Sequence, residues 1–232
     1  METPTRTNTW STLRLLMSAA IVAAVVTQLT ASLTRTAETG GDVATVFANF
    51  FSFFTILSNV IAAVVLAWAA LAALRDPAKA RASLGLSAAL ACATTYMAIT
   101  GIVYNALLRG ITLPQGSEPV PWSNEVLHLV APLFLLLDLV IGSARRGLLW
   151  RVVGAIIAFP LLWVTYTLIR GPLVTNPTTG DPYWYPYPFL NPNNPGGWGM
   201  VIAYVIGIAL AFVVIGFFAV WVTRRRARRD GD

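Results

Sequence analysis

The sequence predicts an all-α membrane protein built as a bundle of six transmembrane helices. Of its 232 residues, 56% are hydrophobic and only 11% are charged, whereas a soluble domain carries about 25% charged residues. Six apolar stretches are long enough to cross a bilayer core, which takes roughly 20 residues of helix. The basic residues are concentrated on every second connection between these stretches. Together these observations exclude a water-soluble globular domain.

The six expected spans differ in length and polarity. They cover residues 13–33, 46–74, 83–108, 124–142, 149–169 and 199–223, and a basic tail occupies 224–232. The second and third exceed what a bilayer requires, so we expect tilt or an extension of the helix beyond it. The fourth is unusual because it is short and begins with polar residues. We expect a single integral membrane domain over residues 1–232, with the first span kept as an uncleaved anchor.

Basic residues are concentrated on alternate connections. Thirteen of the sixteen belong to one set: Arg6, Arg14, Arg75, Lys79, Arg81, Arg145, Arg146, Arg151, Arg224, Arg225, Arg226, Arg228 and Arg229. The other set holds only Arg35, Arg109 and Arg170. Because cytoplasmic connections are enriched in Lys and Arg, we expect both termini in the cytoplasm of a multi-pass cell-membrane protein. The positive charge flanks helix ends, which indicates contact with anionic headgroups and argues against nucleic-acid binding.

Polar residues of the second to fifth spans gather on the side of the membrane away from the arginine-rich connections. Two sets have helical spacing: Ser52, Thr55 and Asn59 in the second span, and Tyr96, Thr100 and Tyr104 in the third. The others are Asn105, Arg109, Asn124, Glu125, His128, Tyr166, Thr167 and Arg170. Polar groups are costly in hydrocarbon, so this one-sided cluster predicts a cavity open toward the outer leaflet. Asp138 lies deeper, and we expect it to pair with a neighbouring polar group.

The connection between the fifth and sixth spans is rich in proline and aromatic residues. Five prolines lie between Pro182 and Pro195, which excludes a regular helix there. Its aromatic residues suit the headgroup level of a membrane. The segment is therefore expected to form an interfacial belt, a lid over the cavity, or a mixture of the two.

His128 is the only histidine in the sequence. One histidine, the distant Cys92 and few acidic residues do not make a metal-ligand set, so we expect no metal and no cofactor. The remaining roles are a satisfied interfacial histidine or a general base. Thr55 is the hydroxyl at the most comparable depth in the second span, and a base at His128 would activate it as a nucleophile. The alternative for Thr55 is a hydrogen bond to the carbonyl four residues earlier.

Five segments in order resemble a known family. They are FFSFFTILSN at 50–59, GIVYNALLR at 101–109, NEVLHLVAP at 124–132, TYTLIRG at 165–171 and YPYPFL at 185–190. Between about residues 47 and 200 the chain resembles the predicted six-pass bacterial membrane proteins related to the animal androgen-induced family. Animal members are intramembrane threonine hydrolases that cleave lipid esters of hydroxylated fatty acids. By motif position, the resemblance implies a nucleophile at Thr55 and its histidine partner at His128.

The function expected on this basis is hydrolysis of a lipid ester through an acyl-threonine. Supporting and substrate-binding roles are expected for Asn59, Tyr104, Asn105, Arg109, Asn124, Tyr166 and Arg170. The two asparagines Asn59 and Asn105, or Tyr104, would donate to the oxyanion. Arg109 and Arg170 would pair with a fatty-acid carboxylate, or would only snorkel to the interface. Membrane lipids and a fatty-acyl ester are the expected partners.

Two functions without catalysis remain open at this point. A transporter or channel is one, although the apolar inner half of the spans argues against a continuous polar path. The other is a structural or assembly protein in which the polar cluster only fastens the helices together.

Overall fold

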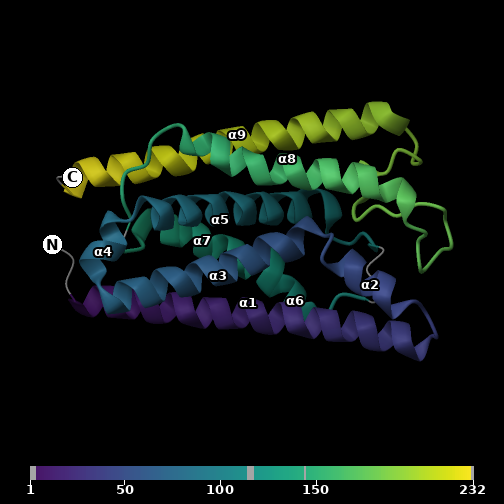
Figure 1. Cartoon of the computed structure of the whole chain (residues 1–232), viewed down its shortest axis with the longest axis horizontal. Helices are drawn as coiled ribbons and strands as arrows, with labels where there is room; N and C mark the ends of the chain where they lie inside the picture. Colours follow the sequence, from purple (N-terminus) through teal and green to yellow (C-terminus); the bar gives the residue numbers. More distant parts are fainter. Residues whose placement is uncertain (1–3, 114–117, 144, 231–232) are drawn as a thin grey trace.

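The computed structural model is all-helical over the residues that it describes, 4–113, 118–143 and 145–230. Within them, six helical segments are long and apolar enough to cross a membrane: Thr7–Glu38, Phe54–Arg75, Leu84–Leu108, Pro121–Ile141, Val152–Leu173 and Gly197–Arg229. The helices run along one axis, and both ends of the chain lie at the same end of the bundle (Figure 1). We call this the terminal end and its opposite the distal end. The six-span, all-α architecture predicted from the sequence is confirmed, and the chain is a multi-pass membrane protein.

The long first and last helices frame the bundle. α1 covers Pro4–Glu38 and packs along α3 (Phe54–Arg75). α9 covers Gly197–Asp230 and packs against α5 (Leu84–Val103) and α8 (Val152–Arg170). Both helices extend beyond the predicted spans at each end. In α9 the helix continues through the arginines, so residues 224–230, which were expected to form a tail, belong to the last helix.

The second predicted span is interrupted, which corrects the expectation of one helix over 46–74. α2 ends at Phe50 and α3 begins at Phe54, with a turn over residues 51–53. Phe53 has an extended backbone, and its ring packs edge-on against Trp184 and Tyr187. The Ser52 carbonyl accepts from the Trp163 indole N–H at 3.0 Å rather than from a helical N–H. Ser52 therefore lies outside α3, and the expected face that it shares with Thr55 and Asn59 does not form.

The remaining elements complete the topology. They are α2 (Val43–Phe50), α3 (Phe54–Arg75), α4 (Pro77–Ala82), α5 (Leu84–Val103), η1 (Tyr104–Leu108), α6 (Pro121–Glu125), η2 (Val126–Val130), α7 (Ala131–Ile141), α8 (Val152–Arg170), η3 (Gly171–Leu173) and η4 (Pro188–Leu190). The third and fourth spans each contain one π-helical turn, η1 and η2. The starts of α2, α4 and α5 are capped by the side chains of Asp42, Asp76 and Ser83, which accept from backbone N–H groups of the first turn.

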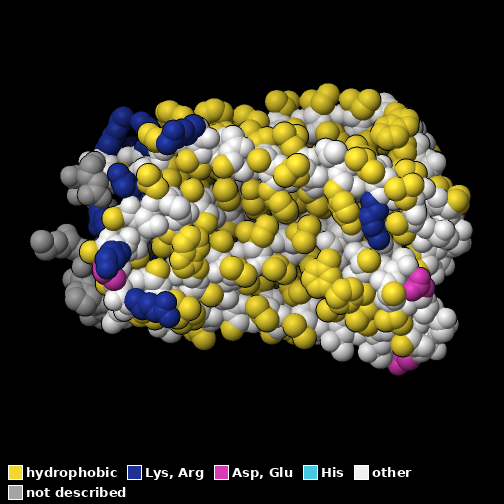
Figure 2. Space-filling model, in the orientation of Figure 1, with side chains coloured by type: hydrophobic (Ala, Val, Ile, Leu, Met, Phe, Trp, Pro, Cys, Tyr) yellow, Lys and Arg dark blue, Asp and Glu magenta, His cyan; other side chains and the backbone are white. Residues whose placement is uncertain are grey.

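The core of the bundle lies around α5, the most buried of the six spans. Its small and hydroxyl-bearing residues allow close packing, and the buried Thr94 and Thr95 satisfy their hydroxyls on the carbonyls of Leu90 and Ala91. Apolar side chains cover much of the flank of the bundle, whereas the basic residues gather at the terminal end (Figure 2). This apolar belt is the surface that a bilayer would cover.

The aromatic segment between α8 and α9, residues 171–196, lies at the distal end (Figure 1). Trp184, Tyr185, Tyr187 and Phe189 are all buried. The Trp184 N–H donates to the Gly171 carbonyl at 2.9 Å, and a Cβ at Gly171 would overlap the Tyr185 ring. The segment is therefore neither a belt on the surface nor a detached lid. It is a cap that is part of the core, and its regular elements among the described residues are the 3-10 turns η3 and η4.

Buried charges join the first and fourth spans at the terminal end. Asp138 is fully buried and accepts from Arg14, through Nε at 2.8 Å and Nη2 at 3.2 Å, and from Arg145 and Trp10. Arg14 also donates to the Ser143 carbonyl at 2.8 Å. Asp138 thus pairs with neighbouring polar groups, as expected. It lies near the opposite end of the fourth span from His128 and belongs to the framework of the bundle.

Replacing Asp138 tests this ion-pair cluster. Asp138→Asn leaves the Arg14 and Arg145 guanidinium groups buried without a counter-charge, which costs about 3–5 kcal/mol when one partner of a buried pair is removed. Unfolding of the purified protein in detergent, followed by circular dichroism, is expected to show this loss. The exposed Asp76 provides the matched control, because Asp76→Asn retains an N-cap residue and is expected to change stability little. Equal stability of the two variants would contradict the assigned role.

Candidate functional site

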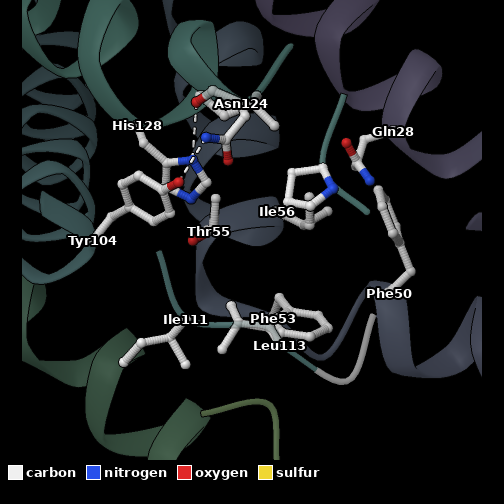
Figure 3. A pocket seen from close by; sticks show the side chains of 12 residues that line it. Gln28, Phe50, Phe53, Thr55, Ile56, Tyr104, Ile111, Leu113, Asn124 and His128 are labelled. Carbon is white, nitrogen blue, oxygen red and sulfur yellow. Dashed lines mark hydrogen bonds between the residues drawn. The ribbon is translucent and has the colours of Figure 1, made fainter. Parts of the chain in front are cut away.

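Thr55 and His128 line the same narrow cavity at the distal end of the bundle. Thr55 lies in the first turn of α3, and His128 lies in the middle of the π turn η2. Tyr104 and Asn124 share the cavity with them (Figure 3). Its volume is about 50 Å³, which is enough for a few water molecules. The structure therefore brings together four of the predicted site residues: Thr55, Tyr104, Asn124 and His128.

Two π turns hold Tyr104 and His128 against each other. Tyr104 opens η1 at the end of α5, and its ring stacks on the imidazole with 3.7 Å between ring centroids and 19° between ring planes. Asn105 fastens the two turns, because its side-chain amide donates to the carbonyls of Gly101 at 2.8 Å and His128 at 3.1 Å. Gly101 permits this approach, since a Cβ there would come within 3.0 Å of the Pro132 side chain. π turns in α-helices are frequently found at functional sites.

The surroundings of His128 select its tautomer. The Nδ1 atom lies 2.9 Å from the backbone carbonyl oxygen of Asn124. A carbonyl oxygen can only accept, so Nδ1 carries the proton and Nε2 keeps its lone pair. The Asn124 side chain also donates to the Tyr104 hydroxyl at 2.6 Å. Asn124 thus fixes both stacked rings, one through its backbone and the other through its side chain, and leaves a nitrogen that can accept a proton.

The hydroxyl of Thr55 differs in its partner from those of three other threonines in the spans. Thr94, Thr95 and Thr167 hydrogen bond to the carbonyl four residues earlier. The Thr55 Oγ1 instead lies 3.3 Å from the Tyr187 hydroxyl. Tyr187 also accepts from the Thr55 N–H at 3.2 Å, a donor that the first turn of a helix leaves free. The Thr55 hydroxyl is thus kept out of the usual helical bond and directed toward the cavity.

Among the described residues, the hydrogen bonds of Thr55 and His128 do not join the two side chains directly. Thr55 bonds to Tyr187, and His128 bonds to Asn124. The two side chains face the same cavity (Figure 3), so a water molecule or a substrate atom held there can lie between them. In active sites without substrate, the hydrogen bond between nucleophile and base is often long or absent, and it tightens when substrate binds.

Tyr187 is a site residue that the sequence analysis did not single out. It lies between two prolines in the cap, and only the fold brings it to Thr55 over 132 residues of chain. Burial raises the pKa of the Tyr187 hydroxyl above its usual value of about 10, so it remains a hydrogen-bond donor at neutral pH. The one signal in the sequence was its place in the segment YPYPFL, which formed part of the family resemblance.

The two asparagines expected to donate to an oxyanion are engaged elsewhere. The Asn59 amide donates to the carbonyls of Thr55 at 2.9 Å and Leu127 at 3.2 Å, which fastens α3 to the fourth span. The Asn105 amide holds the two π turns together, as described above. Neither residue lines the cavity. Of the three expected donors, Tyr104 is the one that the structure places in the cavity.

The remaining expected residues lie around the cavity without lining it. Arg109 forms a two-pronged ion pair with Glu125, at 2.8 and 3.2 Å, beside the Tyr104 ring. Arg170 donates to the Asn49 side chain at 2.7 Å and lies over the Trp184 ring. The Tyr166 hydroxyl lies 3.0 Å from that of Ser52. Both arginines therefore contact protein groups at the distal end, and any substrate carboxylate would compete with those contacts.

Apolar space continues from the cavity into the bundle. A second narrow cavity, of about 40 Å³, shares Thr55 and Tyr104 with the first. A third, of about 50 Å³, lies between α8 and α9 and shares Trp163, Phe189 and Phe212 with the second. Nearly all of the lining of these two cavities is apolar or aromatic. The three cavities form a row from the polar site to the lipid-facing helices.

The described residues contain no group of three or more His, Cys, Asp or Glu side chains that could hold a metal ion. Comparison of the chain with protein-family models, with curated proteins and with solved structures gave no match.

The tautomer of His128 can be measured directly, because the sequence has a single histidine. Nitrogen-15 NMR of histidine-labelled protein is expected to show a neutral ring protonated at Nδ1, since the Asn124 carbonyl accepts from that atom. Tyr104→Phe keeps the ring stack and is expected to retain this tautomer, although it loses the bond from the Asn124 side chain. A ring protonated at Nε2 in the wild-type protein would contradict the assigned geometry.

Proposed function

We propose that the protein is an intramembrane hydrolase of lipid esters, of the hydroxy-fatty-acid-ester type, with Thr55 as nucleophile and His128 as general base. The observation that carries the proposal is the shared cavity. A threonine hydroxyl released from the helical i−4 bond and an imidazole with a free Nε2 face one enclosed space. A nucleophile and a base within reach of one reacting atom are the minimum for acyl transfer.

The chemistry follows in two steps. With an ester carbonyl in the cavity, Nε2 of His128 takes the proton of the Thr55 hydroxyl, directly or through one water, while Oγ1 attacks the carbonyl carbon. The imidazolium returns that proton to the leaving alcohol, and an acyl-threonine remains. Water then attacks the acyl carbon with its proton going to Nε2, and collapse releases the free acid and restores the threonine hydroxyl.

Two tyrosines are suited to stabilise the charge that develops on the carbonyl oxygen. The Tyr187 hydroxyl accepts from the Thr55 N–H, and the Tyr104 hydroxyl accepts from Asn124 Nδ2. Each tyrosine therefore keeps its own hydroxyl proton to donate. A tyrosine hydroxyl that donates to the developing oxyanion stabilises its negative charge in the same way as a backbone N–H. The Tyr187 donor also holds Thr55 itself, which makes it the stronger candidate of the two.

The row of apolar cavities suits the acyl chain of such a substrate. An ester carbonyl at Thr55 would place the chain along Trp163, Phe189 and Phe212 toward α8 and α9. The cavities hold about 50, 40 and 50 Å³, so the helices must separate somewhat to admit a chain. The cap formed by the aromatic segment is the element whose movement would widen the row.

The orientation of the protein is part of the same proposal. Thirteen basic residues on the terminal-end connections, against three on the others, support termini in the cytoplasm of a cell membrane. The site would then lie near the outer leaflet, and a lipid would enter from there. The roles proposed for Thr55 and His128 agree with those that the family resemblance implies.

The hydrolase proposal can be tested with a fluorophosphonate probe, which modifies activated hydroxyl nucleophiles. We expect the purified protein to be labelled at Thr55, and labelling to fall by about 100-fold or more in Thr55→Ala and His128→Ala, since a general base contributes 10²–10⁴ in rate. Thr95→Ala is the matched control, because its hydroxyl bonds to a helix carbonyl away from the cavity. Absence of labelling in the wild type, or equal labelling of all variants, would favour a role in transport or assembly without catalysis.

Tyr187→Phe isolates the contribution of the hydroxyl at Thr55. The phenylalanine keeps the ring contacts with Phe53 and Phe189 but loses both contacts to Thr55, and loss of one such donor costs about 10²-fold in rate. Labelling rate and ester hydrolysis are expected to fall together while the melting temperature changes little. Tyr185→Phe, in the same cap, controls for the general effect of removing a hydroxyl and is expected to remain active. Full activity of Tyr187→Phe would exclude this role.

A further inference from the structure

The arginine-rich end of α9 has two faces with different contacts. Residues of a helix are 100° apart, so Trp221, Arg224, Arg225, Arg228 and Arg229 share one face, while Arg226 points away from it. Arg226 donates to the carbonyls of Leu139 at 2.9 Å and Gly142 at 2.6 Å, which fastens α9 to the end of α7. Arg226 is therefore part of the framework, and the other four arginines are not needed for that contact.

The other four arginines surround an open cavity at the terminal end. Together with Trp150 and Trp221 they line a space of about 520 Å³. Arg224 lies over the Trp150 ring and Arg225 over the Trp221 ring, each with its guanidinium carbon 5.1 Å from the ring centroid. Arg224 also donates to the Leu148 carbonyl at 3.0 Å. None of the described residues that line the cavity is acidic.

Four positive charges around one hollow attract an anion, and guanidinium groups bind phosphate oxygens in a two-pronged manner. The stacking of Arg224 and Arg225 on tryptophan rings orients them at little cost in side-chain entropy. Arg228 and Arg229 are exposed, and they have no hydrogen-bond or ion-pair partner among the described residues. The cavity therefore has donors available for a phosphate group.

The surface next to the cavity is apolar rather than polar. Trp150 packs on Phe217 and Trp221 on Phe218, and all four rings are 43–48% exposed. Tryptophan at the end of a membrane span marks the headgroup level. A free phosphate would leave this aromatic surface uncovered, whereas the acyl chains of a phospholipid would lie on it.

We propose that this cavity binds the phosphate headgroup of an anionic phospholipid, with its acyl chains along Phe217 and Phe218. The site lies at the opposite end of the bundle from Thr55 and His128, so it does not depend on the proposed hydrolase function. It holds its lipid as a bound component of the membrane around it and not as a substrate.

The test measures lipid binding to the full-length protein by native mass spectrometry from detergent. Phosphatidylglycerol and phosphatidylcholine are added in matched titrations, and we expect phosphatidylglycerol to bind at least tenfold more tightly. Arg228→Gln combined with Arg229→Gln is expected to weaken phosphatidylglycerol binding by about 30-fold, given the usual contribution of each basic residue near anionic lipid. Both side chains are exposed, so this variant is expected to fold, which circular dichroism checks.

The matched control removes two charges at the same end but outside the cavity. Arg75→Gln combined with Lys79→Gln alters exposed residues at the end of α3 and in α4, and it is expected to change binding less than about threefold. An equal loss in both double variants would indicate a general charge effect and overturn the proposal, as would equal binding of the two lipids. Displacement of phosphatidylglycerol by inorganic phosphate at similar concentration would overturn it too, because the site would then select a free anion.

Discussion

A bilayer offers no hydrogen-bond partner to a polar side chain, and this constraint governs the arrangement of the whole bundle. Many of the polar side chains inside the spans are bound to another helix or to their own backbone. At the terminal end, Asp138 forms ion pairs with Arg14 and Arg145. At the distal end, the side-chain amides of Asn59 and Asn105 donate to backbone carbonyls of a neighbouring span. Thr55 and His128 differ from these framework residues, because the Thr55 hydroxyl and the second imidazole nitrogen of His128 face a cavity.

The sequence predicted the six spans because hydropathy and length alone decide which segments can cross a membrane. It placed Thr55 and His128 on one side of the membrane because both lie at similar depths, and the family resemblance pointed to the same two residues. The break between α2 and α3 could not be foreseen, since residues 51–53 leave the helix to satisfy contacts with Trp163, Trp184 and Tyr187 far along the chain. Local propensity carries no information about such tertiary contacts.

The details of the site depend on the same long-range contacts. Asn59 and Asn105 have the right chemistry for an oxyanion, but their amides are used between helices. Tyr187 was not selected, because a proline-rich connection is expected at the surface and here folds into the core instead. The π turns at Tyr104 and His128 could not be predicted from the spacing of apolar residues either, since each lies within an otherwise regular helix.

The pairing of Arg14 with Asp138 has a consequence for how the protein is made. Arg14 lies in the first helix, but its counter-charge lies in the fourth and a further bond in the connection after it. Until the fourth span has inserted, Arg14 lacks both of these partners, so its charge would need water or lipid headgroups instead. The terminal end of the bundle can therefore close around Asp138 only after the fourth span has inserted.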